Sequence, residues 1–314
     1  MKGAMEAEVR MSVVVCTHNP DEDRLRRVLE ALREQTLGKE EWELLVVDNA
    51  SEERLSGRWD LGWHPRGRHV REDELGLTPA RLRGIRETSG ALLVWVDDDN
   101  VLDRDYLEVA VRLGAQHPSL GMWGGSLRGE FEVCVPEWAR PYLVYLAVRE
   151  VERARWGMNH DCGVLPPGAG LVVRREVAET YAAAVREMPL RRMLDRRGSE
   201  LTSCGDTDMV LTGMDIGYWS GVFPSLGLTH VIPAGRLEEG YLLRMVEESS
   251  YSFMLLKLVK GLECPEAREG LVRRVRGWMG RVRRRCFWGR HERWFRDAAV
   301  RGRRRAVRVF SGAS

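Results

Sequence analysis

One segment constrains the fold more than any other, because an apolar run at residues 91–96 ends abruptly in Asp97, Asp98 and Asp99. A continuous apolar run of this length is typical of a strand buried on both faces, as in a parallel sheet covered by helices. The three carboxylates would then lie at the carboxyl edge of the sheet, where ligands bind in open α/β sheets. Because adjacent carboxylates repel one another, they favour a bound cation, and oxygen ligands suit Mg²⁺ or Mn²⁺. An acidic loop that faces water is the alternative.

Two apolar segments further upstream have the same organisation. Residues 11–16 are followed by turn-forming residues at 17–20, and residues 44–47 are followed by Asp48. Between them, helical spacing predicts an amphipathic helix whose buried stripe is formed by Leu25, Val28, Leu29 and Leu32. A strand, helix and strand of this length predict a right-handed βαβ unit, so that all three strand ends meet at one edge. The sequence therefore predicts an α/β fold with a Rossmann-like, mostly parallel central sheet flanked by helices.

The two common glycine-rich phosphate loops do not occur in this chain. No G-x-G-x-x-G follows the first strand and no G-x-x-x-x-G-K-[ST] appears, which weighs against a dinucleotide site and a P-loop. At residues 75–85, Thr78 can cap a helix that has Pro79 at its first position, which would place Arg81 near the sheet edge. The guanidinium of Arg81 could clamp a phosphate. A solvated helix face is the simpler explanation of an isolated arginine.

Four motifs in order, VVVCTHNP, LLVVDNAS, LGLTPARLRGI and ALLVWVDDDN, resemble the nucleotide-sugar domain of family 2 glycosyltransferases with the GT-A fold. The resemblance covers residues 11–105 and implies a nucleoside-diphosphate sugar as donor. The donor-binding residues that it implies are Thr17, Asn19, Asp48, Arg81, Asp97 and Asp98. It also implies that Asp99 is a ligand of Mn²⁺ or Mg²⁺. Leu82 departs from the family, which often has asparagine there, so one polar contact is lost.

A second acidic site follows at residues 203–209. Taken alone, Asp206 is a helix N-cap, because a helical pattern of apolar residues follows it. The resemblance instead implies that Asp206 is the catalytic general base, since the family has a Glu-Asp pair before a Gly-Tyr turn and such a turn follows at 217–218. Gly205 replaces the glutamate of that pair, and Asp208 is the second candidate for the base.

A histidine and an arginine downstream complete the expected site. His230 lies in a short apolar stretch, where a lone histidine is usually a core residue. Its position after the catalytic helix resembles the C-terminal metal-binding histidine of many GT-A enzymes, which implies that it joins Asp99 on the metal. A neutral imidazole with a carboxylate suits manganese better than calcium. Arg236, in the loop that follows, could reach the diphosphate.

The implied reaction is a single displacement with inversion, in which Asp206 takes the proton of a hydroxyl on a glycan or lipid-linked acceptor. The metal would neutralise charge on the departing diphosphate. Two other functions remain open. A catalytically silent scaffold subunit that binds nucleotide sugar would explain the departures at Leu82 and Gly205. A nucleotidyltransferase would typically have a basic, glycine-rich loop after the first strand, and residues 17–20 are not such a loop.

Charge is divided unevenly along the 314 residues. Residues 257–308 hold 18 lysines and arginines against 5 acidic residues, a net charge of +13, whereas the rest of the chain carries −11. Helical spacing in this tail aligns an apolar stripe of Leu271, Val272, Val275, Trp278, Met279 and Val282. Such a basic amphipathic helix could lie on an anionic membrane surface or pack on the acidic body. Nucleic acid is not an expected partner, because no base-reading module is recognisable.

The expected organisation has three parts, and the expected compartment is the cytoplasm. Residues 1–105 form the nucleotide-sugar half of one GT-A domain, 106–236 the acceptor and catalytic-base half, and 237–314 a basic helical extension. The first ten residues lack the apolar core of a signal peptide, and no apolar run is long enough to span a bilayer. Six widely spaced cysteines without a C-x-x-C pair favour reduced thiols. Peripheral association with the cytoplasmic membrane face would follow if the tail binds lipid.

Overall fold

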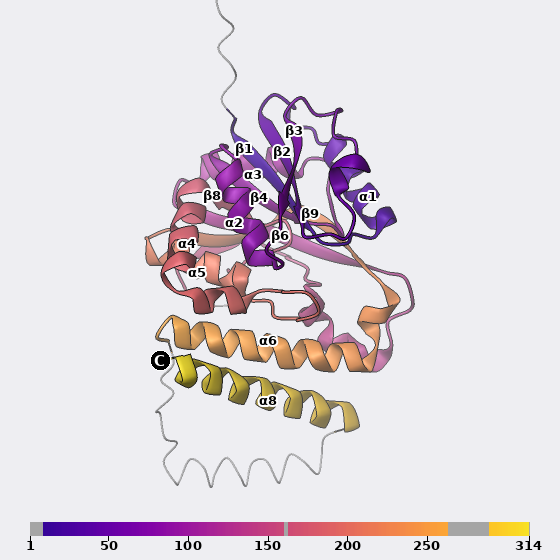
Figure 1. Cartoon of the computed structure of the whole chain (residues 1–314), viewed down its shortest axis with the longest axis vertical. Helices are drawn as coiled ribbons and strands as arrows, with labels where there is room; N and C mark the ends of the chain where they lie inside the picture. Colours follow the sequence, from indigo (N-terminus) through magenta and orange to yellow (C-terminus); the bar gives the residue numbers. More distant parts are fainter. Residues whose placement is uncertain (1–8, 160–162, 263–288, 314) are drawn as a thin grey trace, which may run out of the picture.

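A computed structural model of the chain describes residues 9–159, 163–262 and 289–313. Within these residues a sheet of nine strands is flanked by helices (Figure 1). The strands are β1 (Met11–Thr17), β2 (Trp42–Asn49), β3 (Gly67–Glu72), β4 (Leu92–Asp97), β5 (Asn100–Leu102), β6 (Leu120–Phe131), β7 (Arg155–Gly157), β8 (Val172–Arg174) and β9 (Trp219–Ile232). The α-helices are α1 (Glu22–Arg33), α2 (Leu77–Glu87), α3 (Tyr106–Gln116), α4 (Arg175–Glu187), α5 (Gly205–Asp215), α6 (Glu239–Val259) and α8 (Arg290–Ala313).

The order of the strands brings the predicted strand ends together. The sheet runs β3-β2-β1-β4-β8-β6-β9-β5, and β7 pairs with β9. The first four of these strands are parallel, with Thr17 beside Asp48 and Cys16 beside Asp97 in register. The other half is mixed, because β8 is antiparallel to both β4 and β6. The predicted fold class is confirmed, and the acidic end of β4 lies at the carboxyl edge of the parallel half.

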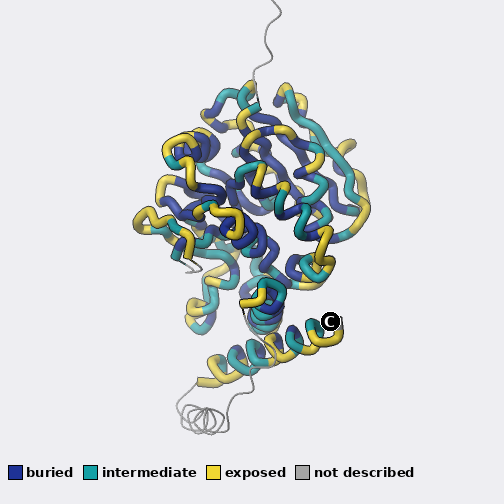
Figure 2. The backbone as a smooth tube through the Cα atoms, turned by 90° about the vertical axis from the view of Figure 1, so that its left-hand side faces the viewer, coloured by how far each residue is buried: buried dark blue, intermediate teal, exposed yellow. Residues whose placement is uncertain are grey.

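Alternating residues of the central strands explain why both faces of the sheet are covered. Val13 and Val15 of β1 belong to the apolar cluster that includes α1 and α3, whereas Val14 belongs to the cluster that includes α2, α4 and α5. The stripe predicted for α1 is buried in the first of these clusters. Figure 2 shows the buried residues gathered in the interior of the molecule, with exposed residues at its periphery. Because both faces of β1 are buried, its sequence is a continuous apolar run rather than an alternating one.

Two long helices, α6 and α8, lie side by side below the sheet domain (Figure 1). A Cβ at Gly302 of α8 would lie 2.1 Å from the carbonyl oxygen of Glu247 in α6, so the two backbones approach closely there. Arg301 Nη2 pairs with Glu247 at 2.7 Å, and Arg305 pairs with Glu248. This part of the basic tail therefore packs on the acidic body, while the stripe predicted at 271–282 lies outside the described residues.

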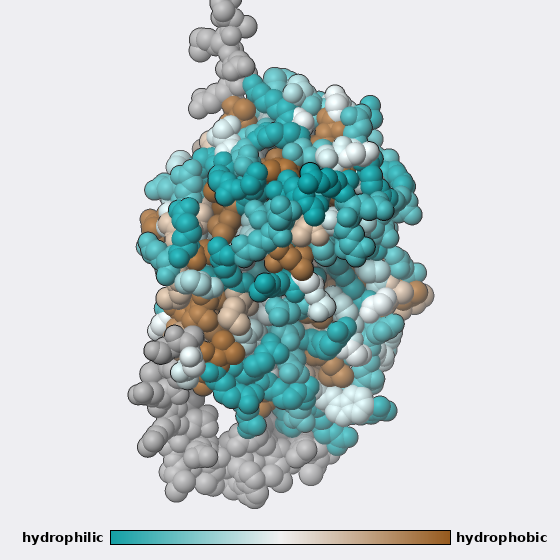
Figure 3. Space-filling view, viewed as in Figure 1, coloured by the Kyte–Doolittle hydropathy of each residue, from teal (hydrophilic) through white to brown (hydrophobic). Residues whose placement is uncertain are grey.

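Apolar surface is limited on the part of the molecule that the structure describes. None of the helices in the described ranges is both long and apolar enough to cross a bilayer. The face seen in Figure 3 is mostly hydrophilic, with separate small apolar patches. Cys16, Cys134 and Cys204, which lie within the described ranges, are free thiols.

Candidate functional site

A cavity of about 860 Å³ opens at the carboxyl edge of the parallel strands. Its walls come from the ends of β1 and β4, the first turns of α2 and α5, the segment 165–169, and one side of α6. Of the residues expected from the sequence, those that line it are Thr17, Arg81, Asp97, Asp98, Asp99, Asp206, His230 and Arg236. Two segments more than a hundred residues apart, 97–99 and 206, thus share one hollow.

The three adjacent aspartates differ in their surroundings. The Thr17 hydroxyl donates a hydrogen bond to Asp98. Burial, reinforced by the charges of Asp99 and Asp97, raises the pKa of Asp98 to about 7, and burial beside Asp99 also raises the pKa of Asp97. Burial acts in the same sense on Asp99, but His230 and Arg236 hold the pKa of Asp99 well below its ordinary value. Asp99 is therefore the carboxylate that is firmly ionised, and a cation bound beside it would relieve the repulsion on the other two.

Asp99 and His230 present two donors that fit a divalent cation. His230 Nε2 lies 3.4 Å from Asp99 Oδ2, and both side chains are buried. His230 Nδ1 lies 3.0 Å from the carbonyl oxygen of Leu146, which can only accept, so Nδ1 carries a proton, and a metal bound beside Asp99 would take the lone pair of Nε2 once any proton on Nε2 has left. Within the described residues no cluster of three or more such ligands occurs. Further ligands would have to come from substrate phosphates, which is common for Mg²⁺ and related ions.

A guanidinium occupies the space between these two donors. Arg236 Nη1 lies 2.9 Å from Asp99 Oδ2 and 3.0 Å from His230 Nε2. Arg236 belongs to η4, a short 3-10 helix (Ala234–Leu237) that directly follows β9. Since a cation and a guanidinium cannot share this space, a bound metal would require Arg236 to move away from the pair.

The carboxylate of Asp206 is held in a fixed orientation at the start of α5. Its Oδ2 accepts a hydrogen bond from the Gly168 backbone N–H at 2.7 Å, and its Oδ1 accepts one from the Thr207 N–H at 2.7 Å. Asp208, two residues along the same helix, does not line the cavity. Its buried carboxylate pairs instead with Arg191 at 2.8 Å and lies 3.9 Å from Lys260 Nζ. Of the two candidates for the base, only Asp206 faces the cavity.

Two of the expected donor-binding residues, Asp48 and Asn19, do not line the cavity. Asp48 accepts hydrogen bonds from the backbone N–H groups of Ser51 and Leu55 and pairs with Arg71 at 3.0 Å. Asn19 has a positive φ of 47°, and its side-chain oxygen accepts a hydrogen bond from the Glu52 N–H at 2.8 Å. Both side chains therefore fix the loops after β1 and β2. Their neighbours Thr17, His18 and Asn49 line the cavity.

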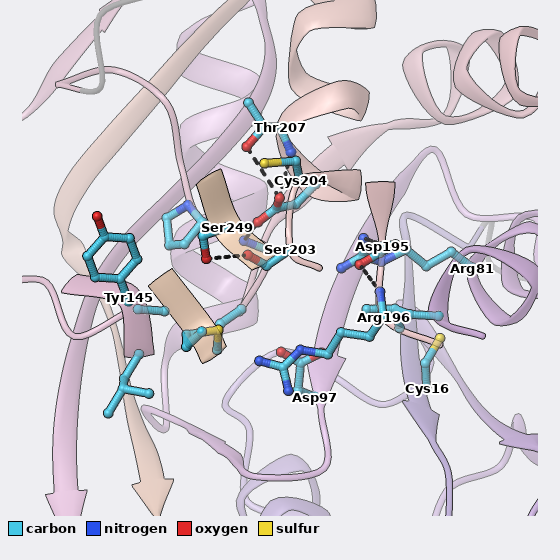
Figure 4. A pocket seen from close by; sticks show the side chains of 18 of the residues that line it. Cys16, Arg81, Asp97, Tyr145, Asp195, Arg196, Ser203, Cys204, Thr207 and Ser249 are labelled. Carbon is cyan, nitrogen blue, oxygen red and sulfur yellow. Dashed lines mark hydrogen bonds and ion pairs between the residues drawn. The ribbon is translucent and has the colours of Figure 1, made fainter. Parts of the chain in front are cut away.

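Several lining residues were not expected from the sequence. Figure 4 shows Asp195 beside Arg81, and Arg196 extending toward Asp97. The polar lining residues to which the sequence assigned no individual role in the site include Asp195, Arg196, Ser203, Ser249, Lys257 and Arg303. The first three lie in the loop between η3 (Pro189–Leu194) and α5, and the others lie on α6 and α8. No local pattern marks them, because each reaches the cavity through the packing of elements that are distant in sequence.

Comparison with known proteins identifies sequence and fold relatives. A family profile described as glycosyl transferase family 2 matches residues 12–174. Glycosyltransferase AglE of Haloferax volcanii is 29% identical over 104 residues, which are 32% of this chain and 34% of AglE. The uncharacterized protein y4gI of Sinorhizobium fredii is 33% identical over 112 residues, which are 34% of this chain and 12% of that protein.

The fold is similar to that of TarS from S. aureus. The TarS crystal structure superposes with a TM-score of 0.52 at 15% identity, covering 79% of this chain and 39% of TarS. TarS 1–349 in complex with UDP-GlcNAc gives a TM-score of 0.51 at 15% identity, covering 80% of this chain and 66% of that one. At this identity the likeness shows the GT-A fold. The matched regions span about a third of AglE and 39% of TarS.

Proposed function

Because the chain belongs to glycosyl transferase family 2, we propose that it transfers a sugar from a nucleoside-diphosphate donor to an acceptor hydroxyl. The observation that carries this proposal is the shared cavity, where the strand-end aspartates 97–99 face Asp206 across one hollow. A uridine diphosphate sugar is the donor to test first, because the structurally similar TarS 1–349 was solved with UDP-GlcNAc. The chemistry below follows from the side chains around the cavity.

The donor would lie along the ends of β1 and β4. Thr17 and Asp98 form one hydrogen-bonded pair there, and Asp97 and Asp98 are the oxygen ligands available to a ribose or to a cation on the diphosphate. Arg81 supplies buried positive charge on the same wall. Asp48 and Asn19 would act indirectly in this scheme, since their side chains hold the two loops that shape the nucleoside end of the cavity.

Asp206 is the proposed general base. As the acceptor oxygen attacks the anomeric carbon, its proton passes to the carboxylate of Asp206, while the bond to the diphosphate breaks and its electron pair leaves with the diphosphate. A single displacement of this kind inverts the anomeric centre. The hydrogen bonds from the Gly168 and Thr207 N–H groups support this role, because they keep the carboxylate oriented in the cavity without a flexible partner.

Asp99 and His230 would hold Mn²⁺ or Mg²⁺, whose charge would offset the charge that grows on the departing diphosphate. Arg236 supplies a fixed positive charge at the same place when it pairs with Asp99. A guanidinium can also donate two parallel hydrogen bonds to a diphosphate, so Arg236 would bind the diphosphate after a metal displaces it from Asp99.

We further propose that the acceptor is a glycan or lipid-linked molecule and that the chain contacts an anionic membrane surface. A second cavity, of about 710 Å³, lies between α6 and α8, and its cationic lining residues are Arg301, Arg303, Arg304, Arg305 and Arg308. Met254 and Arg303 line both cavities. The positive surface of α8 is thus continuous with the mouth of the proposed active site, which would favour an acceptor held at a negatively charged surface.

Thermal-shift measurements with a panel of nucleotide sugars and Mn²⁺ test the proposed function most directly. The correct donor should raise the melting temperature by mass action, and incubation with that donor should release the free nucleoside diphosphate. If a nucleotide sugar binds but is neither transferred nor slowly hydrolysed, the chain would be a silent scaffold subunit. Release of pyrophosphate from a nucleoside triphosphate would indicate a nucleotidyltransferase.

A further inference from the structure

A buried ion pair lies directly behind the proposed base. Asp195 Oδ2 accepts a hydrogen bond from Arg81 Nη1 at 2.8 Å, and the two residues are only 4% and 3% exposed. The other oxygen of Asp195 accepts the backbone N–H of Arg196 at 3.1 Å. Removing one partner of such a buried pair leaves an uncompensated charge, which is strongly unfavourable. Arg81 therefore depends on Asp195 for its position.

The same guanidinium also lies next to Asp206. A Cβ at Gly168 would be 2.9 Å from Asp206 Oδ2 and 3.1 Å from Arg81 Nη2, so both groups border the same small space. The negative charges of Asp195 and Asp206 both raise the pKa of Arg81, which keeps it ionised against the effect of burial. Arg81 thus stands between two carboxylates, one of which is the proposed base.

Gly205 provides the room that Asp195 needs. A Cβ at position 205 would lie 2.3 Å from Asp195 Oδ2, a distance that no real Cβ atom tolerates. The loop that carries Asp195 is closed at its base by a hydrogen bond from the Cys204 N–H to the Leu194 carbonyl at 2.8 Å. The Thr202 hydroxyl closes it again by donating to the Asp195 carbonyl at 2.6 Å. The Asp195 carboxylate therefore occupies the site where a side chain on residue 205 would begin.

We propose that Asp195 is a positioning residue that holds Arg81 beside Asp206 and prevents the guanidinium from pairing fully with the base. This inference rests on the proposed function. Without Asp195, Asp206 would be the nearest carboxylate to Arg81, and a direct pair would make Asp206 a poorer proton acceptor. The other charged side chains and histidines that line the cavity are His18, Asp97, Asp98, Asp99, Arg149, Arg196, His230, Arg236, Lys257 and Arg303. Among the described residues, Asp195 is the group on this lining that accepts a hydrogen bond from Arg81.

The first test replaces Asp195 by an isosteric neutral side chain. Asp195→Asn should lower kcat about tenfold or more and move the acidic limb of the kcat profile to lower pH, with little change in donor KM. Glu43→Gln is the matched control, because Glu43 is also a buried carboxylate paired with an arginine, Arg68, at 2.9 Å, but lies outside the cavity. It should lower the melting temperature and leave the pH profile unchanged. A wild-type pH profile and kcat in Asp195→Asn would overturn the inference.

The second test exchanges the carboxylate between the two positions. Aspartate is the replacement of choice at 205, because its carboxyl oxygens lie only two bonds beyond Cβ and Asp195 Oδ2 is 2.3 Å from that Cβ site. Gly205→Asp alone should lower both the melting temperature and kcat. In the Asp195→Gly background the same substitution should raise both, since it returns a carboxylate to Arg81. Additive losses in the double variant would overturn the inference. The melting temperatures test whether a carboxylate from either position can pair with Arg81, even if no sugar transfer is found. An absence of transfer would contradict the proposed function, not this pairing.

Discussion

Hydrogen bonds and ion pairs distinguish the two acidic residues at the start of α5, of which Asp206 lines the cavity. Among the described residues, the oxygens of Asp206 accept hydrogen bonds from two backbone N–H groups and a neighbouring hydroxyl, and no cationic side chain is bonded to them. Asp208 is paired with Arg191 and lies near Lys260. A general base must be exposed to the acceptor, and of these two residues only Asp206 lines the cavity.

Replacing this base should separate chemistry from binding. Asp206→Asn keeps an oxygen that can accept the Gly168 N–H but loses the proton-accepting charge. Turnover should fall by roughly 10²–10⁴-fold, while the shift in melting temperature produced by the nucleotide sugar stays close to that of the wild type. Product formation and thermal shift are measured on the same preparation. Undiminished turnover would remove Asp206 from the role of base.

The positions of His230 and Arg236 around Asp99 predict that two substitutions change the affinity for metal in opposite directions. His230→Ala removes a donor 3.4 Å from Asp99 Oδ2 and should weaken the binding of Mn²⁺. Arg236→Ala removes a competing cation 2.9 Å from the same oxygen and should strengthen it severalfold. Free Mn²⁺ is followed by electron paramagnetic resonance in the absence of donor. Equal affinities in the wild type and both variants would contradict the metal assignment.

Individual site residues were predictable from the sequence where they follow a predicted strand or match a motif of the family that the chain resembles. Asp97, Asp98 and Asp99 follow an apolar run, and the parallel register of β1 and β4 carries them to the cavity. Asp48 also follows an apolar run, but its carboxylate is bonded to backbone N–H groups and to Arg71 instead of lining the cavity. Gly205 was visible as a departure from the family motif, yet only the folded chain shows that Asp195 fills its place.

The helix and the strands that carry a sustained apolar pattern were predicted from the sequence, and the shortest strands were not. The stripe of α1 and the apolar runs of β1, β2 and β4 extend over enough positions to show a period or a continuous burial. By contrast, β5, β7 and β8 contain three residues each, which is too few for any pattern. Their pairing is set by the neighbouring strands, so the mixed half of the sheet could not be derived from local sequence.

The segment between β2 and β3 contains a buried histidine that should make stability depend on pH. His64 packs 4.1 Å from the Trp42 ring; its Nδ1 accepts the Arg66 N–H, and its buried Nε2 has no hydrogen-bond partner. Burial, with Lys39 and Arg66 nearby, lowers the pKa of His64 to about 4. As the pH falls, His64 therefore binds a proton in the unfolded chain before it does so in the folded chain. The contribution of His64 to the free energy of unfolding should be fully present above about pH 6.5. It should decrease toward pH 4 by up to about 1.4 kcal/mol per pH unit.

Denaturant unfolding at several pH values, with a substitution at His64, tests this prediction. His64→Leu removes the titrating group, so the free energy of unfolding should lose this part of its slope between pH 6.5 and pH 4, whatever its absolute value. His117→Leu is the control, because His117 is only partly buried, and that variant should keep the wild-type slope. An unchanged slope in His64→Leu would exclude His64 as the source.

Docking of α8 on α6 should depend on one glycine. Alanine generally stabilises a helix interior relative to glycine by about 1 kcal/mol. At Gly302, however, the added Cβ would lie 2.1 Å from the Glu247 carbonyl oxygen, whereas at Gly312 it would meet no atom within 4 Å. Gly302→Ala should therefore speed hydrogen exchange along α8, and Gly312→Ala should slow it or leave it unchanged. Equal effects of the two substitutions would show that α8 does not pack as described.

At the scale of the whole molecule, the uneven charge of the sequence becomes an arrangement in space. Arg301 and Arg305 of α8 are paired with Glu247 and Glu248 of α6, so part of the basic tail neutralises the acidic body. Arg303, Arg304 and Arg308 are exposed and line the second cavity. The two alternatives offered by the sequence are therefore compatible, since packing on the body uses some arginines of α8 and leaves others exposed, where the proposed anionic surface could contact them.

Reversing the available charges tests whether that surface is a membrane. The double variant Arg304→Glu and Arg308→Glu should lose at least tenfold of its affinity for vesicles containing phosphatidylserine, because each cation near the headgroups contributes about 1 kcal/mol. Co-sedimentation measures the bound fraction, with neutral vesicles as reference. The matched control, Arg26→Glu and Arg33→Glu, reverses the same number of charges at exposed positions of α1 and should bind like the wild type. If the α8 variant sediments as well as the wild type, the exposed arginines of α8 do not bind the membrane. The second cavity would then have to be explained by a soluble anionic acceptor.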